Sequence, residues 1–190
     1  MKALTEEEGA AALSLARQAL EAAVRNESFS PPPLPPVFQE KRGVFVTLTE
    51  GGELRGCIGL PYPVMPLAGA IREAAASAAL QDPRFPPVEP DELPGIVVEV
   101  TVLSVPAPLA GSPEKRDSCV RVGVHGLIVQ GMGRSGLLLP QVATEYAWTA
   151  CDFLDHTCVK AGLPPGSWRS PRTEVLIFEG QIFHEQEPGP

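Results

Sequence analysis

The sequence predicts an α+β fold with a largely antiparallel sheet and flanking helices. Pairs of β-prone segments are separated by short glycine-containing turns, which is the pattern of antiparallel hairpins. Helical segments lie between these hairpins, without the regular strand–helix alternation of a doubly wound parallel fold. The chain has 190 residues, 44% of them hydrophobic and 20% charged. This size and composition are typical of a globular protein with one domain, or with one core and a smaller lobe.

The chain begins with the signals of a helix and continues into a proline-rich connection. Thr5 and Glu8 have the spacing of a capping box, and apolar residues then recur at helical spacing as far as Val24. Residues 31–36 read PPPLPP, which excludes a helix and favours polyproline II. We interpret this run as a stiff connection to the next strand; a ligand for a proline-reading domain is the alternative.

Turn residues, prolines and β-branched runs delimit the later elements. In the first half of the chain we expect a hairpin of 43–49 and 53–59, a helix opened by Pro66 and ended before Asp82-Pro83, and a strand over 95–104. The segment 113–122 is ambiguous. After it we expect a second hairpin of 126–130 and 136–139, a helix starting at Pro140, a helix capped at Thr149 and running to Lys160, and a final strand over 173–183. No internal repeat is visible.

Charge and hydropathy narrow the classes of partner. The formal net charge is -8 and the pI is about 4.9, which argues against nucleic acid and against anionic membrane surfaces as partners. No apolar run approaches the roughly 18 residues of a membrane-spanning helix. Three glutamates stand near the N-terminus, where a signal peptide needs basic residues. We therefore expect a cytoplasmic protein.

The cysteines and histidines do not form a metal-binding pattern. Cys57, Cys119, Cys151 and Cys158 include no CxxC pair and resemble neither a zinc site nor a secreted disulfide framework. The three histidines lack closely spaced acidic or cysteine partners. We expect four reduced thiols, no metal and no cofactor.

The first candidate site is the run Leu-Arg-Gly-Cys-Ile-Gly. On a regular strand, Arg55 and Cys57 share one face with their Cα atoms about 7 Å apart. A nearby guanidinium favours the reactive thiolate. Gly56 and Gly59 leave room for another backbone or a ligand. The alternative is that Cys57 merely fills space, since cysteine is among the most buried residue types.

Two further segments carry candidate residues. Residues 82–87 form a proline-stiffened loop with Arg84, which could carry a site; a helix-terminating turn with an Asp–Arg pair is the equal alternative. His125 stands before a strand and could be a general base, although a structural histidine is commoner there. The glycine-rich turn around Arg134 could bind an anion, but a hairpin turn explains its glycines, and no Walker motif is present.

Several segments together resemble one known family. They are Gly43 to Leu48, Leu54 to Gly59, Asp82 to Pro87, His125 to Ile128, Gly133 to Ala143 and Lys160 to Pro165. In this order, from about residue 5 to 184, the chain is similar to the AmmeMemoRadiSam system protein A family, or AMMECR-type domain. The Leu-Arg-Gly-Cys-Ile-Gly block is the hallmark of that family. The resemblance predicts a single AMMECR-type domain over 1–190, with the proline run 31–36 peculiar to this chain.

The resemblance also implies features that the residues alone do not give. It implies a larger and a smaller subdomain with a cleft between them, lined by the hallmark block. Memo-type and radical S-adenosylmethionine (SAM) proteins of the same system are the implied partners. The implied functional residues are Cys57 and Arg55, then Arg84, His125, Arg134 and Gln141, and no reaction is assigned to the family.

Two functions are compatible with these residues. In the first, Cys57 is the nucleophile of an enzyme, Arg55 holds an anionic substrate and His125 transfers protons. In the second, the same residues form a non-catalytic surface that binds a partner protein or a modified peptide. A scaffold without any small-molecule site is a third possibility. Replacing Cys57 with serine separates the first from the second.

Overall fold

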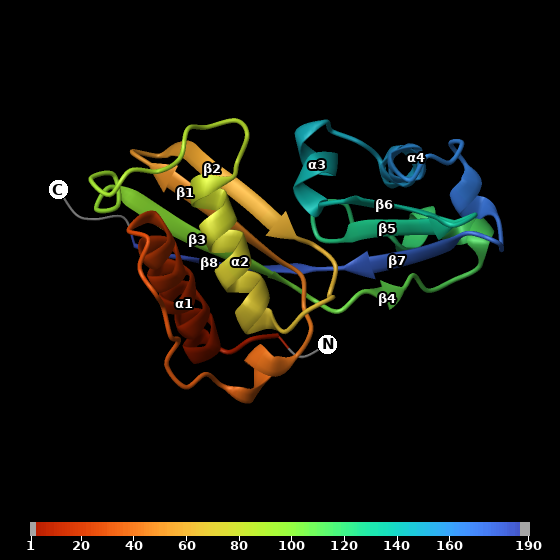
Figure 1. Ribbon diagram of the computed structural model, residues 1–190. Helices are drawn as coiled ribbons and strands as arrows, with labels where there is room; N and C mark the ends of the chain where they lie inside the picture. The colour runs from red at the N-terminus through yellow and green to blue at the C-terminus, as the bar shows by residue number, and fades with distance from the viewer. Residues whose placement is uncertain (1–2, 187–190) are drawn as a thin grey trace. The chain divides into compact units, whose positions relative to one another are not determined.

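The computed structural model describes residues 3–186 and confirms an α+β fold with antiparallel sheets. The strands form two four-stranded sheets rather than one. The chain divides into two compact units, which we call unit 1 (residues up to Val105, together with those from Gln181 onward) and unit 2 (Pro106–Gly180). Figure 1 shows the elements of both units.

Unit 1 is a sheet with two helices on one face (Figure 1). The strand order is β2-β1-β3-β8, and β1 is antiparallel to both of its neighbours, so β2 is an edge strand. The elements are α1 (Glu6–Val24), η1 (Pro36–Gln39), β1 (Val44–Glu50), β2 (Glu53–Leu60), α2 (Leu67–Leu80), β3 (Ile96–Leu103) and β8 (Gly180–His184). The predicted capping box at Thr5 and Glu8 is present.

Alternation along the strands separates a buried face from an open face. In β1, Val44, Val46 and Leu48 are fully buried and belong to the unit 1 core with the alanines of α2. The residues between them, including Phe45 and Thr47, are only partly buried. This is the pattern of a sheet with one covered face.

A β-bulge interrupts the β1–β2 hairpin. Leu48 pairs with Gly56, but the next residue of β1, Thr49, pairs with Leu54. Arg55 is therefore the extra residue, without a partner on β1. A bulge bends its strand and redirects side chains, and it is common at sheet edges. The regular alternation expected for residues 54–58 does not hold here, and Leu54 is 42% exposed.

Unit 2 is a second sheet with its own core. The strand order is β4-β7-β5-β6, and the pairs are antiparallel. The elements are β4 (Ala107–Pro108), η2 (Pro113–Lys115), η3 (Asp117–Cys119), β5 (Gly126–Gly131), β6 (Arg134–Leu138), α3 (Pro140–Glu145), α4 (Ala150–Lys160), η4 (Ser167–Arg169) and β7 (Glu174–Phe178). Phe153 and Leu154 of α4 pack with Leu127, Val129 and Trp168 in the core.

One predicted element is wrong. The single strand expected over 173–183 is two strands, β7 and β8, which belong to different sheets and are separated at Glu179. The apolar residues on either side read as one β-prone run, whereas Glu179 and Gly180 are exposed where the chain leaves one sheet for the other. The ambiguous segment 113–122 contains two short 3-10 helices.

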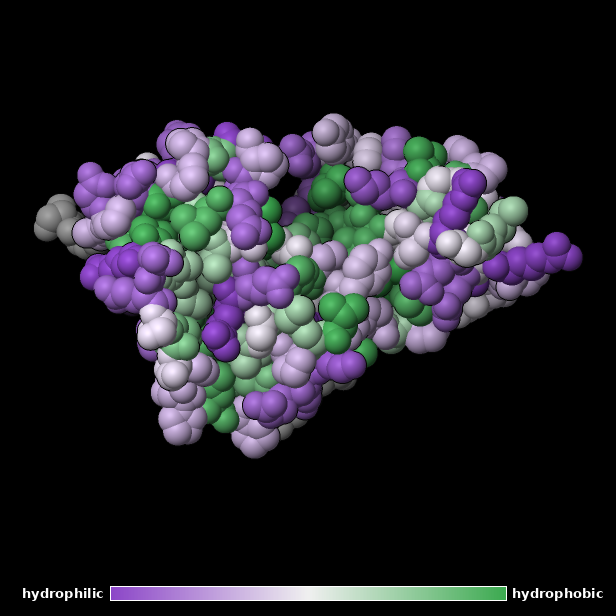
Figure 2. Space-filling model, in the orientation of Figure 1, coloured by the Kyte–Doolittle hydropathy of each residue, from purple (hydrophilic) through white to green (hydrophobic). Residues whose placement is uncertain are grey.

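Hydrophilic and hydrophobic side chains are interspersed on the visible surface (Figure 2). Among residues 3–186, no helix combines the length and the apolar character needed to cross a membrane.

Candidate functional site

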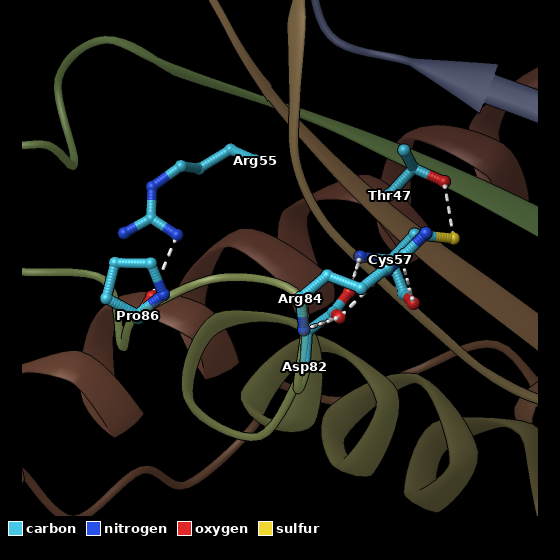
Figure 3. A network of polar contacts seen from close by, with 6 residues as sticks. All are labelled: Thr47, Arg55, Cys57, Asp82, Arg84 and Pro86. Carbon is cyan, nitrogen blue, oxygen red and sulfur yellow. Dashed lines mark hydrogen bonds and ion pairs between the residues drawn. The ribbon is translucent and has the colours of Figure 1, made fainter.

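β2 presents Cys57 on the open face of the unit 1 sheet. Cys57 pairs with Thr47 across the hairpin, and the Thr47 hydroxyl donates a hydrogen bond to Sγ of Cys57 at 3.4 Å (Figure 3). Thr47 pairs on its other side with Glu99 of β3. A thiol, a hydroxyl and a carboxylate thus stand in one row across three strands. The Cys57 side chain is partly exposed.

The two glycines of the hallmark block admit parts of the chain itself rather than a ligand. A Cβ atom on Gly56 would lie 2.2 Å from the carbonyl oxygen of Ala78, so glycine is required for the close approach of α2 to β2. A Cβ atom on Gly59 would lie 2.1 Å from the ring of Phe45, which covers that position. Both glycines therefore have a packing role.

Asp82 and Arg84 hold the backbone of Cys57. Oδ2 of Asp82 accepts the backbone N–H of Cys57 at 2.8 Å, and Nη2 of Arg84 donates to the backbone carbonyl of Cys57 at 3.2 Å (Figure 3). The two side chains also form a bidentate ion pair, with Arg84 Nε 2.9 Å from Oδ1 and Nη2 2.7 Å from Oδ2. We call Thr47, Cys57, Asp82 and Arg84 the Cys57 cluster.

The ion pair favours the charged forms of Asp82 and Arg84. Hydrogen bonds from Arg84 hold the pKa of Asp82 well below its usual range, with the Cys57 amide acting in the same direction against the effect of burial. Asp82 in turn raises the pKa of Arg84. The Asp82 side chain is 2% exposed and that of Arg84 is 54% exposed, so the carboxylate is internal while the guanidinium reaches solvent.

Arg55 extends away from Cys57 (Figure 3). Its guanidinium forms a bidentate ion pair with Glu92, at 2.7 Å from Nε and 3.1 Å from Nη2. It also donates to the backbone carbonyls of Pro86 at 2.9 Å and Pro87 at 3.4 Å. The hydrogen bonds to Glu92 raise the pKa of Arg55 and lower that of Glu92. Arg55 thus connects β2 to the loop that follows α2.

The expected pairing of Arg55 with the Cys57 thiol is accordingly revised. Arg55 is the bulged residue of β2, so the regular alternation that placed it beside Cys57 does not apply. The guanidinium that contacts Cys57 belongs to Arg84, through the backbone carbonyl. Both arginines already have a carboxylate partner within unit 1.

His125 lies in unit 2, where it contacts Arg121 and Glu179. The backbone N–H of Arg121 is 3.1 Å from Nδ1, Arg121 Nε is 3.1 Å from Nε2, and a Glu179 oxygen is 3.6 Å from Nε2. Burial lowers the pKa of His125, and the charge of Arg121 lowers it further, whereas Glu179 opposes them. The imidazole is therefore held neutral and buried by its own unit.

The other predicted residues also lie in unit 2. Arg134 begins β6, and its Nη1 donates to the backbone carbonyl of Gly162 after α4. Gln141 is exposed in the first turn of α3. Among residues 3–186, no group of three histidine, cysteine or acidic residues is arranged to hold a metal ion.

Sequence reasoning did not identify Thr47 or Glu92. A regular hairpin from the pair Glu50–Glu53 would place Thr47 opposite Gly56, and only the bulge moves it opposite Cys57. Glu92 lies 37 positions from Arg55 in the sequence, and no local pattern connects the two residues.

Comparison with known proteins identifies the family. Residues 13–183 match the family model AMMECR1. A protein of Methanothermobacter thermautotrophicus is 54% identical over 185 residues, covering 96% of each chain. A protein of Methanosarcina mazei is 54% identical over 191 residues, covering 97% of this chain and 95% of the relative. The crystal structure of an uncharacterised Pyrococcus horikoshii protein is similar with a TM-score of 0.81 at 45% identity, covering 98% of this chain and 96% of that one. The chain belongs to the AMMECR1 family.

Proposed function

We propose that this protein is a binding module that recognises a partner protein through the open sheet face around Cys57. The observation that carries the proposal is the internal neutralisation of both motif arginines. Glu92 occupies the fork of Arg55, and Asp82 occupies that of Arg84. An anionic substrate that made the same bidentate contacts would have to displace a hydrogen-bonded carboxylate in each case. Such charge-assisted bidentate pairs are among the stronger polar contacts.

The surroundings of the thiol also favour recognition over nucleophilic catalysis. A nucleophilic cysteine needs a base or a cation directed at its sulfur. Sγ of Cys57 accepts a hydrogen bond from the Thr47 hydroxyl, which is not a base at neutral pH. The guanidinium of Arg84 also interacts with the Cys57 side chain, but its charge is already paired with the carboxylate of Asp82. Thr47 and Cys57 instead offer a small, partly exposed polar patch on a rigid sheet, which suits a contact surface.

The family resemblance supplies the partners to test. We propose a Memo-type or a radical SAM protein of the same system as the binding partner. The net charge of -8 favours a partner with a basic surface. All of this net charge falls in unit 1, because the lysines and arginines of unit 2 equal its acidic residues in number.

Titration calorimetry with each purified partner tests the proposal. Thr47→Lys adds a long charged side chain to the centre of the proposed face and should weaken binding at least tenfold, about 1.4 kcal/mol. Ala10→Lys adds the same charge at an exposed position of α1 and should leave the affinity unchanged. Equal affinities for the two folded variants, or no binding by wild type to either partner, would refute the proposal.

A thiol enzyme is the second candidate, and one observation favours it. Cys57 is a partly exposed residue whose sulfur accepts a hydrogen bond, whereas Cys158 is buried. If Cys57 reacts covalently with a substrate or partner, Cys57→Ser will abolish the reaction while keeping the hydrogen-bonding geometry. If the protein only binds, Cys57→Ser will retain its affinity. The same variant thus distinguishes the two functions.

A further inference from the structure

The outer edge of β2, on the side away from β1, carries backbone N–H and C=O groups that do not pair with β1. In an antiparallel sheet the N–H and C=O groups of one residue point to the same side, and this side alternates along the strand. The contacts of Cys57 with Asp82 and Arg84 show that its backbone groups point away from β1. Gly59 faces the same way by alternation. An open edge of this kind is a template for strand pairing.

The segment of residues 82–92, which we call the edge cap, occupies this template. Asp82 accepts the N–H of Cys57 at 2.8 Å, and Arg84 donates to its C=O at 3.2 Å. These are the acceptor and the donor that one residue of a neighbouring strand would supply. Two side chains therefore replace one residue of an adjacent strand.

Arg55 fixes the same segment further along β2. Its guanidinium binds the carbonyls of Pro86 and Pro87 together with the carboxylate of Glu92. Glu92 also accepts the backbone N–H of Glu89 at 2.6 Å, which closes the end of the edge cap on itself. Residues 54–59 and 82–87, two of the segments that carry the family resemblance, thus contact each other: the first supplies the strand edge and the second covers it.

We infer that the edge cap keeps β2 from pairing with β2 of a second copy of this chain. Antiparallel pairing of a strand with itself about a two-fold axis is self-complementary, so every copy offers a matching edge. In the symmetric register Cys57 stands opposite Cys57 of the second copy, with Cα atoms about 5.5 Å apart. This inference concerns the edge of β2 and does not depend on what the open face binds.

Opening the cap should produce a dimer with a defined contact. Arg84→Ala frees the carbonyl of Cys57, and Asp82→Ala with Arg84→Ala frees both backbone groups. The double variant should reach twice the wild-type mass in light scattering after gel filtration. Mild oxidation with diamide should then join the copies through Cys57, because about 5.5 Å lies within the Cα separation of disulfides. Cys57→Ser in this background should abolish the cross-link and retain the dimer.

A matched control separates the edge from general effects of charge and composition. Glu27→Ala with Arg172→Ala removes one carboxylate and one guanidinium at exposed positions outside the edge cap and should keep the wild-type mass. A folded double variant with the wild-type mass at all concentrations would overturn the inference. A dimer that does not cross-link through Cys57 would also overturn it, since another surface would then associate. If the double variant does not fold, Arg84→Ala alone decides, because that side chain is 54% exposed; cross-linking of Cys57 no faster than in wild type would count against the cap.

Discussion

Replacing Gly56 with alanine tests the close approach of α2 to β2. The added Cβ atom would lie 2.2 Å from the carbonyl oxygen of Ala78 and 3.2 Å from its carbonyl carbon. Real Cβ atoms essentially never approach another heavy atom within 3.0 Å. The obstructing atoms are backbone, so rotation of a side chain cannot relieve the overlap, and α2 and β2 must move apart.

Such a displacement disturbs the hydrophobic core of unit 1. Ala74, Ala75 and Ala78 are almost completely buried where α2 faces the sheet. Overpacking of a well-packed core typically costs about 1–3 kcal/mol. We expect the upper end, about 3 kcal/mol, because a whole helix has to shift. For a protein of this size that loss lowers the melting temperature by roughly 6–12 °C.

The assay can separate the two units. Trp148 and Trp168 both lie in unit 2, so tryptophan fluorescence follows unit 2 while far-UV circular dichroism follows both. Gly56→Ala should lower the denaturant midpoint seen by circular dichroism. Gly69→Ala in α2 is the matched control, since its added Cβ would lie 3.5 Å from the sulfur of Met65, an ordinary van der Waals distance. It should stabilise the protein by up to about 1 kcal/mol. Equal stability of Gly56→Ala and wild type would refute this account of the glycine.

Three further predictions follow from the other contacts of unit 1 and from the cysteines. Asp82→Asn should reduce the dependence of the unfolding free energy on pH. The lowered pKa of Asp82 stabilises the folded protein above the ordinary carboxyl pKa of about 3.9, and this stabilisation is lost as the pH falls below that value. Denaturation series from about pH 5 to pH 2 in which the variant and wild type lose stability equally would exclude this contribution of Asp82. Glu92→Gln should destabilise the protein by about 1–3 kcal/mol, because the Arg55 guanidinium loses a charged partner in a largely buried position; an unchanged urea midpoint would contradict this. Cys57 should be alkylated in the native protein faster than Cys158, which is buried with a raised pKa; short-time labelling read by mass spectrometry with the reverse order would disprove it.

Cys151 is the thiol expected to compete with Cys57 for the fastest alkylation in the native protein. Cys151 is partly exposed in the first turn of α4, and Nη2 of Arg169 lies 3.3 Å from its sulfur. A cation beside a cysteine at a helix N-terminus is the environment that promotes thiol reactivity. Arg84→Ala, rather than Arg55→Ala, is the variant expected to alter the labelling of Cys57, because Arg84 makes the contact with that residue.

Local signals in the sequence located the helices and hairpins well. Capping boxes at Thr5 and Thr149 mark the starts of α1 and α4, since side-chain caps satisfy backbone groups within three residues. The glycines at 51 and 52 mark the first hairpin. These predictions succeed because the interactions that determine them join residues only a few positions apart in the sequence.

The candidate site was only partly predictable, because its geometry depends on contacts between distant residues. The bulge at Arg55 changes the pairing of β2 by one residue and turns Arg55 toward Glu92. No sequence pattern in residues 54–59 predicts that bulge. The Asp–Arg pair at 82–84 was visible in the sequence, but its attachment to the backbone of Cys57 required the tertiary structure.

The affinity of Cys57→Ser for a partner protein tests the central claim most directly. Serine keeps a small polar side chain opposite Thr47 but removes the thiol. If the surface only recognises its partner, the dissociation constant for the Memo-type or radical SAM protein should stay within about threefold of the wild-type value, a change in binding free energy of less than about 1 kcal/mol. Mass spectrometry of the wild-type complex should show an unmodified Cys57. Loss of the interaction in the folded serine variant, together with a covalent adduct on Cys57 in wild type, would contradict the proposal and establish thiol chemistry at this site.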